Sequence, residues 1–166
     1  RPCSTIARAL AVPGDVLVPV DLAQVDVRVE PTALPFQAPA PNTAVTWNGR
    51  DVLWLGPDEW FVVGEPADEG AIVDDLTAAL AGHHRSIVVV SANRIVFDLD
   101  DALAALSSGC GLDLDPARFP PGTCAQTLFG QAQVILHQGD ERTTRLFARP
   151  SFAGYVGDRL RAARVT

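Results

Sequence analysis

Two groups of three short strand-like runs limit the possible folds of this chain more than any other feature of its sequence. The first group comprises residues 44–47, 51–55 and 60–64. Asn48-Gly49 and residues 56–59 connect these runs, and both connections have residues that favour tight turns. The second group comprises residues 123–129, 133–138 and 143–148. Such short turns connect antiparallel neighbours, because parallel strands need a crossover of roughly a dozen residues. The pattern therefore predicts antiparallel meanders and argues against a doubly wound parallel sheet.

The other elements are isolated strands and helices placed around these meanders. Period-two alternation predicts a strand over residues 25–30, followed by a proline-rich loop over residues 31–41. Further strands are expected over residues 87–90 and 95–99, and a helix over residues 70–81. We expect Asp100 to cap a helix that runs to Ser107, and Ser151 to open an amphipathic C-terminal helix. Residues 1–20 are interpreted as an extended arm.

Together these elements predict an α+β fold, with two-layer antiparallel sheets and helices on one face. Both halves contain a meander followed by a helix, so we expect one unit over residues 1–166 made of two ferredoxin-like lobes. The lobes would span residues 22–84 and 85–166 and share a core. A single larger sheet remains the alternative, because periodicity does not distinguish the two arrangements.

Charge and composition exclude several classes of function. The formal net charge of −7 disfavours binding to nucleic acid or to anionic membranes. All 13 basic residues are arginine, so Schiff-base chemistry and a lysine general base are excluded. No uninterrupted aliphatic run, such as residues 87–90, approaches the ~20 residues that a membrane-spanning helix needs.

The cysteines and histidines do not form a recognisable reactive or metal-binding motif. Cys3, Cys110 and Cys124 are odd in number and lack the C-x-x-C spacing, which favours reduced thiols and a cytoplasmic setting. We interpret Cys110 and Cys124 as buried, unreactive thiols. His83 and His84 are adjacent in sequence and suit a solvated helix end, while His137 suits a packing or edge position in a strand. We expect no catalytic, cofactor-binding or metal-binding residue on this chain.

Aromatic residues and one arginine are candidates for structural or interface roles. Trp47, Trp54 and Trp60 lie on successive predicted strands, where large rings fill a core, form an interface or stack on a ligand. Arg94 is a candidate for a bidentate contact with a carboxylate, either within the chain or on a partner.

Several motifs together resemble a known family. They are LWLGPDEW at residues 53–60, SANR at 91–94, SGCGLDLDP at 108–116, FPPGTCAQT at 119–127 and RPSF at 149–152. In this order they resemble the gamma subunit of heterotetrameric sarcosine oxidase. The resemblance extends from residue 53 to about residue 163.

This resemblance implies a fold related to the folate-binding aminomethyltransferases and a non-catalytic subunit within a larger complex. The complex would oxidise sarcosine to glycine and transfer the one-carbon unit to tetrahydrofolate. The expected partners are the alpha, beta and delta subunits, and FAD, FMN, NAD and tetrahydrofolate are implied on those chains rather than on this one. The residues that we expect to have interface or structural roles are Trp54, Asp58, Trp60, Arg94, Cys110, Phe119 and Phe152.

One departure from the family pattern affects the expected interface, and one alternative function remains. The family usually carries a Gly-Pro turn after the strand that here ends at Leu99, and this chain has Asp100-Asp101 instead. The alternative function is a free-standing folate-binding or aminomethyltransferase-like domain, although the chain is too short for the additional domain of such enzymes. An iron-sulfur maintenance factor of the same superfamily is disfavoured because its Lys-Gly-Cys-Tyr motif is absent.

Overall fold

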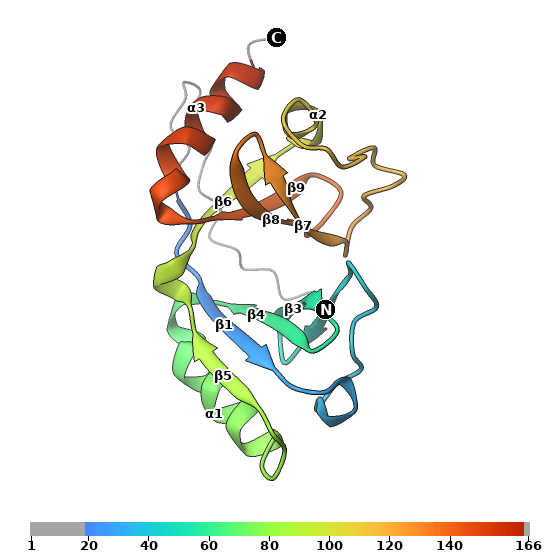
Figure 1. Cartoon of the computed structure of the whole chain (residues 1–166), viewed down its shortest axis with the longest axis vertical. Coiled ribbons are helices and arrows are strands. Elements are labelled where there is room, and N and C mark those ends of the chain that lie inside the picture. The colour runs from blue at the N-terminus through green and yellow to red at the C-terminus, as the bar shows by residue number, and fades with distance from the viewer. Residues whose placement is uncertain (1–18, 165–166) are drawn as a thin grey trace.

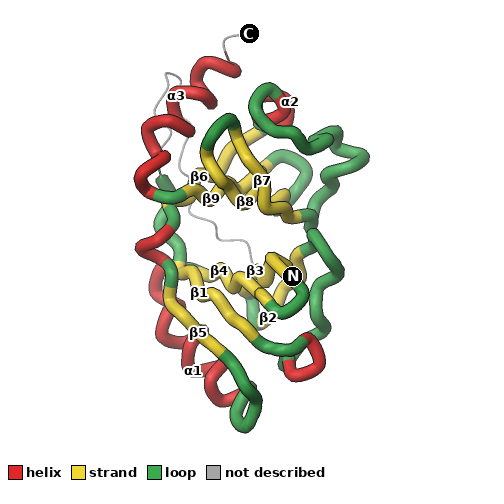
Figure 2. The backbone as a smooth tube through the Cα atoms, viewed as in Figure 1, coloured by secondary structure: helices red, strands yellow, loops and turns green. Residues whose placement is uncertain are grey.

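The computed structural model describes residues 19–164, which form four layers stacked along the long axis of the molecule (Figure 1). Two antiparallel sheets occupy the middle layers and face each other, and helices cover the outer face of each sheet (Figure 2). The predicted arm over residues 1–20 lies outside the described residues except for its last two positions, of which Val20 forms a bridge with Val96.

In the described part of the chain, the first sheet has five strands in the order β2-β3-β4-β1-β5. Their bounds are Ala23–Arg28 (β1), Ala44–Trp47 (β2), Arg50–Gly56 (β3), Glu59–Gly64 (β4) and Ser86–Val89 (β5). Asn48 and Gly49 both adopt positive φ, 51° and 79°, as a two-residue hairpin turn between β2 and β3 requires. The predicted first meander is confirmed.

The second sheet, counted over the same described residues, has four strands in the order β6-β9-β8-β7. Their bounds are Ile95–Asp100 (β6), Cys124–Phe129 (β7), Ala132–Gln138 (β8) and Thr143–Ala148 (β9). In each sheet, the last strand of a meander pairs with an earlier strand: β4 with β1, and β9 with β6. The two halves of the chain therefore share one connectivity.

Three helices flank the sheets within residues 19–164: Glu69–Ala79 (α1), Leu103–Ser107 (α2) and Ala153–Arg164 (α3). Helix α1 packs on the first sheet, whereas α2 and α3 cover the second (Figure 1). Short 3-10 turns at Pro31–Ala33, Pro66–Asp68, Ser91–Asn93 and Pro150–Phe152 connect the elements.

The core is divided into three apolar layers because side chains alternate between the two faces of a strand. Val25 and Trp60 face α1, and Leu136 faces α2 and α3. Between the sheets lies a third cluster, in which Phe61 and Phe147 meet edge to face with ring centroids 5.2 Å apart. Burial on both faces explains why residues 60–63 form a continuous hydrophobic run.

The predicted α+β class with two antiparallel sheets is confirmed, but some boundaries were wrong. Asp100 does not cap α2: it is the last residue of β6, paired with Thr143, and Ala102 occupies the N-cap position without a side-chain hydrogen bond. The C-terminal α-helix begins at Ala153 rather than Ser151, because Pro150–Phe152 form a 3-10 turn. The division into lobes 22–84 and 85–166 stays a prediction, although β5 pairs with β1 in the first sheet.

Candidate functional site

The inner face of the second sheet carries an unusual row of polar side chains. The strand register aligns Cys124 with His137, His137 with Arg145, and Arg145 with Asp98. We call these four residues the inner polar row. Cys124 belongs to the apolar inter-sheet cluster. The other three lie two residues along their strands from members of that cluster, His137 from Ile135 and Arg145 from Phe147. Buried polar side chains of this kind require hydrogen-bond or charge partners. The row is therefore the first candidate for a functional site.

Arg145 is the centre of the inner polar row. Its Nε lies 2.7 Å from Oδ1 of Asp98 and its Nη2 lies 3.0 Å from Oδ2, so the contact is bidentate. Its Nη1 lies 3.7 Å from Oδ2 of Asp51, which belongs to β3 of the first sheet. Burial opposes the charge of Arg145, but the hydrogen bond and charge of Asp98 outweigh it and raise the pKa of the guanidinium. The arrangement connects the two sheets electrostatically.

His137 is buried beside this ion pair, with its Nδ1 4.0 Å from Oδ2 of Asp51. Burial lowers the pKa of His137 below its ordinary value, and the nearby Asp51 only partly offsets this effect. Burial therefore favours the neutral imidazole, and this position is consistent with the packing role that the strand position predicts.

Cys124 lies next to His137 in the register, but it is not an activated thiol. Its Sγ donates to the carbonyl oxygens of Thr43 at 3.3 Å and of Trp54 at 3.5 Å. Burial raises the pKa of Cys124 to about 11, so the thiolate that a nucleophile needs is not formed at neutral pH. The predicted burial of Cys124 is confirmed, and its raised pKa is consistent with an unreactive thiol.

At one open end of the inter-sheet space lies a cavity of about 880 Å³, which we call the inter-sheet cavity. Its walls come from β1 and the 90–94 segment on one side, and from β7, β8 and the end of β9 on the other. The apolar part of the lining includes Ile135, Phe147 and Leu128, and the last of these is 51 % exposed. The volume is within the range of small-molecule sites, roughly 300–1,000 Å³.

Three charged residues line the inter-sheet cavity: Asp26, Arg94 and Arg149. The guanidinium of Arg94 lies 5.0 Å from the ring centroid of Phe61. Burial lowers the pKa of Arg94, and the neighbouring charge of Arg149 adds to this effect while Asp26 opposes it. Burial, together with the charge of Glu59, raises the pKa of Asp26.

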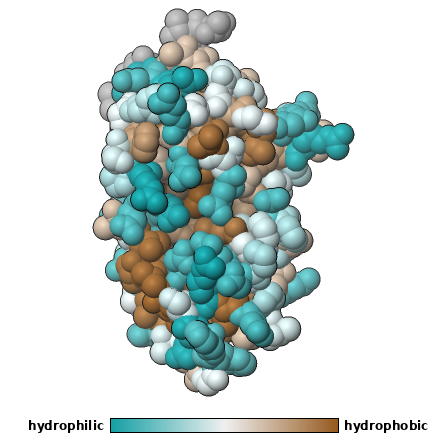
Figure 3. Space-filling view, viewed as in Figure 1, coloured by the Kyte–Doolittle hydropathy of each residue, from teal (hydrophilic) through white to brown (hydrophobic). Residues whose placement is uncertain are grey.

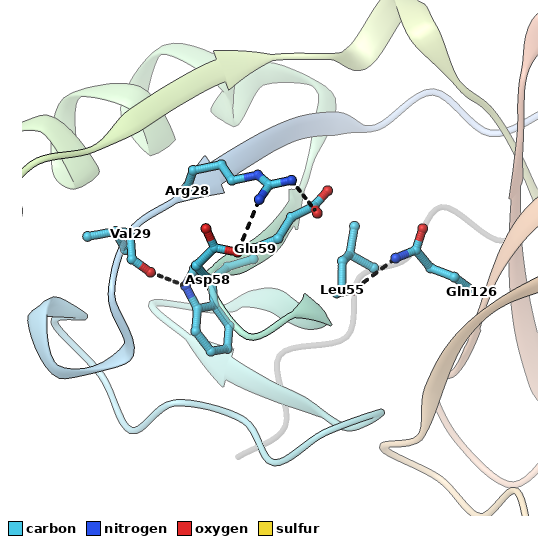
Figure 4. A network of polar contacts seen from close by, with 7 residues as sticks. Arg28, Val29, Leu55, Asp58, Glu59 and Gln126 are labelled. Carbon is cyan, nitrogen blue, oxygen red and sulfur yellow. Dashed lines mark hydrogen bonds and ion pairs between the residues drawn. The ribbon is translucent and has the colours of Figure 1, made fainter.

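A surface network borders the first sheet close to Asp26. Arg28 donates to Asp58 at 3.0 Å and to Glu59 at 2.9 Å (Figure 4). Gln126 of β7 reaches the other sheet, where its Nε2 donates to the carbonyl oxygen of Leu55 at 2.9 Å. This hydrogen bond joins the two sheets directly beside the cavity.

Of the seven residues predicted to have interface or structural roles, only Arg94 lines the inter-sheet cavity. Trp60 is 1 % exposed and its indole Nε1 donates to the carbonyl oxygen of Val29 at 3.1 Å. Trp54 packs, partly buried, against the same cluster beneath α1. Asp58 is exposed and pairs with Arg28. An interface role for these residues stays a prediction.

The remaining three lie at the opposite, α2–α3 side of the second sheet. Phe119 is buried in the core, and Phe152 packs edge to face on Tyr155 with centroids 6.2 Å apart. The prediction that Cys110 is buried was wrong: the residue is half-buried, although burial still raises the pKa of its thiol. These positions favour structural roles in the second half of the molecule.

Sequence reasoning missed most of the charged residues that the structure brings together between the sheets. Arg145, Asp98 and Asp51 form the buried ion-pair network, and Asp26 and Arg149 complete the charged lining of the cavity. One signal was available: charged residues at strand positions within otherwise hydrophobic runs, such as Asp98 between Phe97 and Leu99, point to buried pairs.

Other kinds of site find no support in the described part of the molecule. Residues 19–164 contain no cluster of three histidine, cysteine or carboxylate side chains that could hold a metal ion. Among the described helices, none combines the length and the apolar character required to cross a bilayer. In Figure 3, apolar and polar side chains alternate over the visible face, with an apolar patch over β5, where Val88 and Val89 are exposed.

Comparison with known proteins places the chain in a family. Residues 20–165 match the model of the sarcosine oxidase gamma subunit family. The sarcosine oxidase subunit gamma of Corynebacterium sp. (strain U-96) is 33 % identical over 111 residues, which cover 66 % of this chain and 53 % of that protein. The corresponding subunit of Corynebacterium sp. (strain P-1) is 34 % identical over 128 residues, covering 75 % and 61 %. The chain thus spans between half and two thirds of these relatives.

Solved structures agree with this placement. A chain of the heterotetrameric sarcosine oxidase from Corynebacterium sp. U-96, solved with pyrrole 2-carboxylate, superposes with a TM-score of 0.77 at 28 % identity, over 87 % of this chain and 80 % of that one. The aminomethyltransferase T of Bartonella henselae shares the fold, with a TM-score of 0.64 at 13 % identity over 86 % and 44 %. The predicted relationship to the aminomethyltransferase fold is confirmed. This chain belongs to the sarcosine oxidase gamma subunit family.

Proposed function

We propose that this chain is a non-catalytic subunit of a heterotetrameric sarcosine oxidase. The observation that supports the proposal most strongly is the match over residues 20–165 to the gamma subunit family, together with the likeness to a chain of a solved heterotetramer. Within the described residues, Arg145 contacts Asp51 and Cys124 donates to the carbonyl oxygen of Trp54, and both contacts join the second sheet to β3 of the first. This is consistent with a structural contribution to the complex.

In the proposed complex the partners are alpha, beta and delta subunits in the cytoplasm. The partner chains would hold FAD, FMN, NAD and tetrahydrofolate and would carry out the oxidative demethylation of sarcosine to glycine, with transfer of the one-carbon unit to tetrahydrofolate. This chain would supply a surface on which those subunits assemble.

Co-expression tests the assignment. This chain, carrying an affinity tag, is produced together with the three proposed partners, and the purified material is examined for flavin absorbance and for sarcosine-dependent hydrogen peroxide formation. We expect a flavin-coloured complex that retains all four chains, and omission of this chain should reduce the yield of assembled complex. Recovery of a colourless, solitary chain from every such preparation would contradict the proposal.

The aminomethyltransferase-like fold supports one alternative, a free-standing folate-binding domain. It predicts saturable quenching of tryptophan fluorescence when the purified chain is titrated with tetrahydrofolate. The subunit proposal expects no such response from this chain alone, so the two functions are distinguishable.

A further inference from the structure

The inter-sheet cavity concentrates positive charge in a molecule that is negative overall. Its charged lining consists of two arginines and one aspartate, whereas the whole chain has a formal net charge of −7. Arg149 directly follows Ala148, and Arg94 directly precedes Ile95, which is paired with Ala148 across β6 and β9. Antiparallel pairing therefore brings the two arginines to the same end of the sheet.

Neither arginine is neutralised by a close contact within the described chain. Arg28, Arg50, Arg142 and Arg145 each form an ion pair with an aspartate or glutamate at 4.0 Å or less, but no such pair with a described residue involves Arg94 or Arg149. The close partner of the Arg94 side chain is the face of Phe61. Asp26 attracts Arg94 across the cavity without forming an ion pair. A partly buried guanidinium in this situation gains from an added anion.

The rest of the lining suits the body of an organic anion. Asn93, Gln133 and Ser151 carry side-chain donors, and Phe147 and Ile135 provide an apolar wall. We propose that the inter-sheet cavity is a carboxylate-binding site in which Arg94 and Arg149 hold the carboxylate. The carboxylate belongs either to a free small molecule or to an acidic side chain of another subunit. The site does not depend on the oxidase assignment.

Benzoate and its neutral isostere benzamide provide a matched pair of probes for this site. Isothermal titration of the full chain with each probe measures the contribution of the carboxylate charge. We expect benzoate to bind and benzamide to bind at least about tenfold more weakly, with benzoate binding weakened by added salt. Equal binding of the two probes, or no binding of benzoate, would overturn the proposal.

Substitutions test whether benzoate binds at Arg94 and Arg149. Arg94→Gln and Arg149→Gln should each weaken benzoate binding about tenfold or more, whereas Arg118→Gln, at an exposed position outside the cavity, should leave it unchanged. Arg149 is exposed, so its variant tests the site even if loss of the Arg94 contact with Phe61 impairs folding. Wild-type affinity in a folded Arg149→Gln variant would contradict the assignment.

The source of the carboxylate is distinguished in the co-expressed complex. If the ligand is a free molecule, the complex binds benzoate as the chain does, and Arg149→Gln removes that binding. If another subunit supplies the carboxylate, the complex no longer binds benzoate, and Arg149→Gln weakens retention of this chain while Arg118→Gln does not. Loss of benzoate binding in the complex without any effect of Arg149→Gln on retention would count against both sources.

Discussion

At the scale of single residues, the buried contact between Arg145 and Asp98 is expected to contribute strongly to stability. The side chains of Arg145 and Asp98 are only 9 % and 14 % exposed, and their contact is bidentate. Asp98→Asn would leave the guanidinium without its main counter-charge, and breaking a buried pair costs about 3–5 kcal/mol. We expect the free energy of unfolding in urea to fall by this order.

Asp101→Asn is the matched control for this measurement. Asp101 also pairs with an arginine, Arg142, but the two side chains are 63 % and 67 % exposed, and exposed pairs contribute about 0–1 kcal/mol. Asparagine also tolerates the positive φ of 49° at this position. Equal losses from the two substitutions would show that burial does not control the strength of the Asp98 contact.

His137 should make the stability of the protein dependent on pH below neutrality. Its folded-state pKa is lowered from 6.5 by burial, so the unfolded chain binds this proton more tightly. Acidification through pH 6.5 therefore favours unfolding, and stability rises again as the pH increases. Between pH 7.5 and 5.5 we therefore expect the free energy of unfolding to fall.

Urea denaturation of the wild type and of His137→Gln at both pH values checks this expectation. The variant shares every other titrating group, so the difference between the two proteins isolates the imidazole. The wild type should lose more stability than the variant on acidification. The same loss in both proteins would mean that His137 does not carry the pH dependence.

At the scale of elements, the join between the end of α2 and the β7–β8 turn is a close packing point. Gly109 accepts a hydrogen bond from the backbone of Gly130 at 2.8 Å, and a Cβ at Gly109 would lie 2.6 Å from the ring of Phe129. Gly109→Ala should therefore destabilise the protein by about 1–3 kcal/mol through overpacking. Gly111→Ala, which meets no atom within 4 Å, should be nearly neutral. Thermal unfolding measures the stability of both variants. Equal stability of the two variants would contradict close packing of Gly109 against Phe129.

Element prediction succeeded where a local signal was strong. The Asn48-Gly49 turn and the hydrophobic runs of both meanders predicted strands close to those observed. The cap assigned to Asp100 was wrong because pairing with Thr143 extends β6 through that residue. A capping motif depends on a few adjacent residues, whereas the end of a strand depends on how far its partner extends.

At the scale of the whole molecule, the inter-sheet core should make both halves unfold together. Trp47, Trp54 and Trp60 all lie in the first sheet, so tryptophan fluorescence reports on that half. Phe147 belongs to the second sheet and packs edge to face on Phe61 of the first. We expect Phe147→Ala to lower the free energy of unfolding by about 3–5 kcal/mol. The unfolding transitions measured by tryptophan fluorescence and by far-UV circular dichroism should shift by the same amount. An unshifted fluorescence transition would show that the halves unfold independently.

The candidate site was predictable only in part, because most of its residues come from distant segments. Arg94 stood out in the sequence within the SANR motif, and its predicted contact with a carboxylate leads to the proposed site. Asp26 and Arg149 gave no comparable signal. Their positions depend on how the first and second sheets face each other. Residues near Asp26 and Arg149 in the sequence do not determine this packing.

The amino-acid sequence by itself determined the antiparallel meanders, the α+β class, the absence of lysine chemistry and the family, since these follow from turn residues, alternation, composition and motifs. Only the tertiary structure decided that Asp51 approaches Arg145 from the other sheet and that Arg94 and Arg149 share one cavity. The physical reason is that strand order and sheet packing arise from contacts between residues far apart in the chain, and a side chain's burial and pKa depend on those contacts.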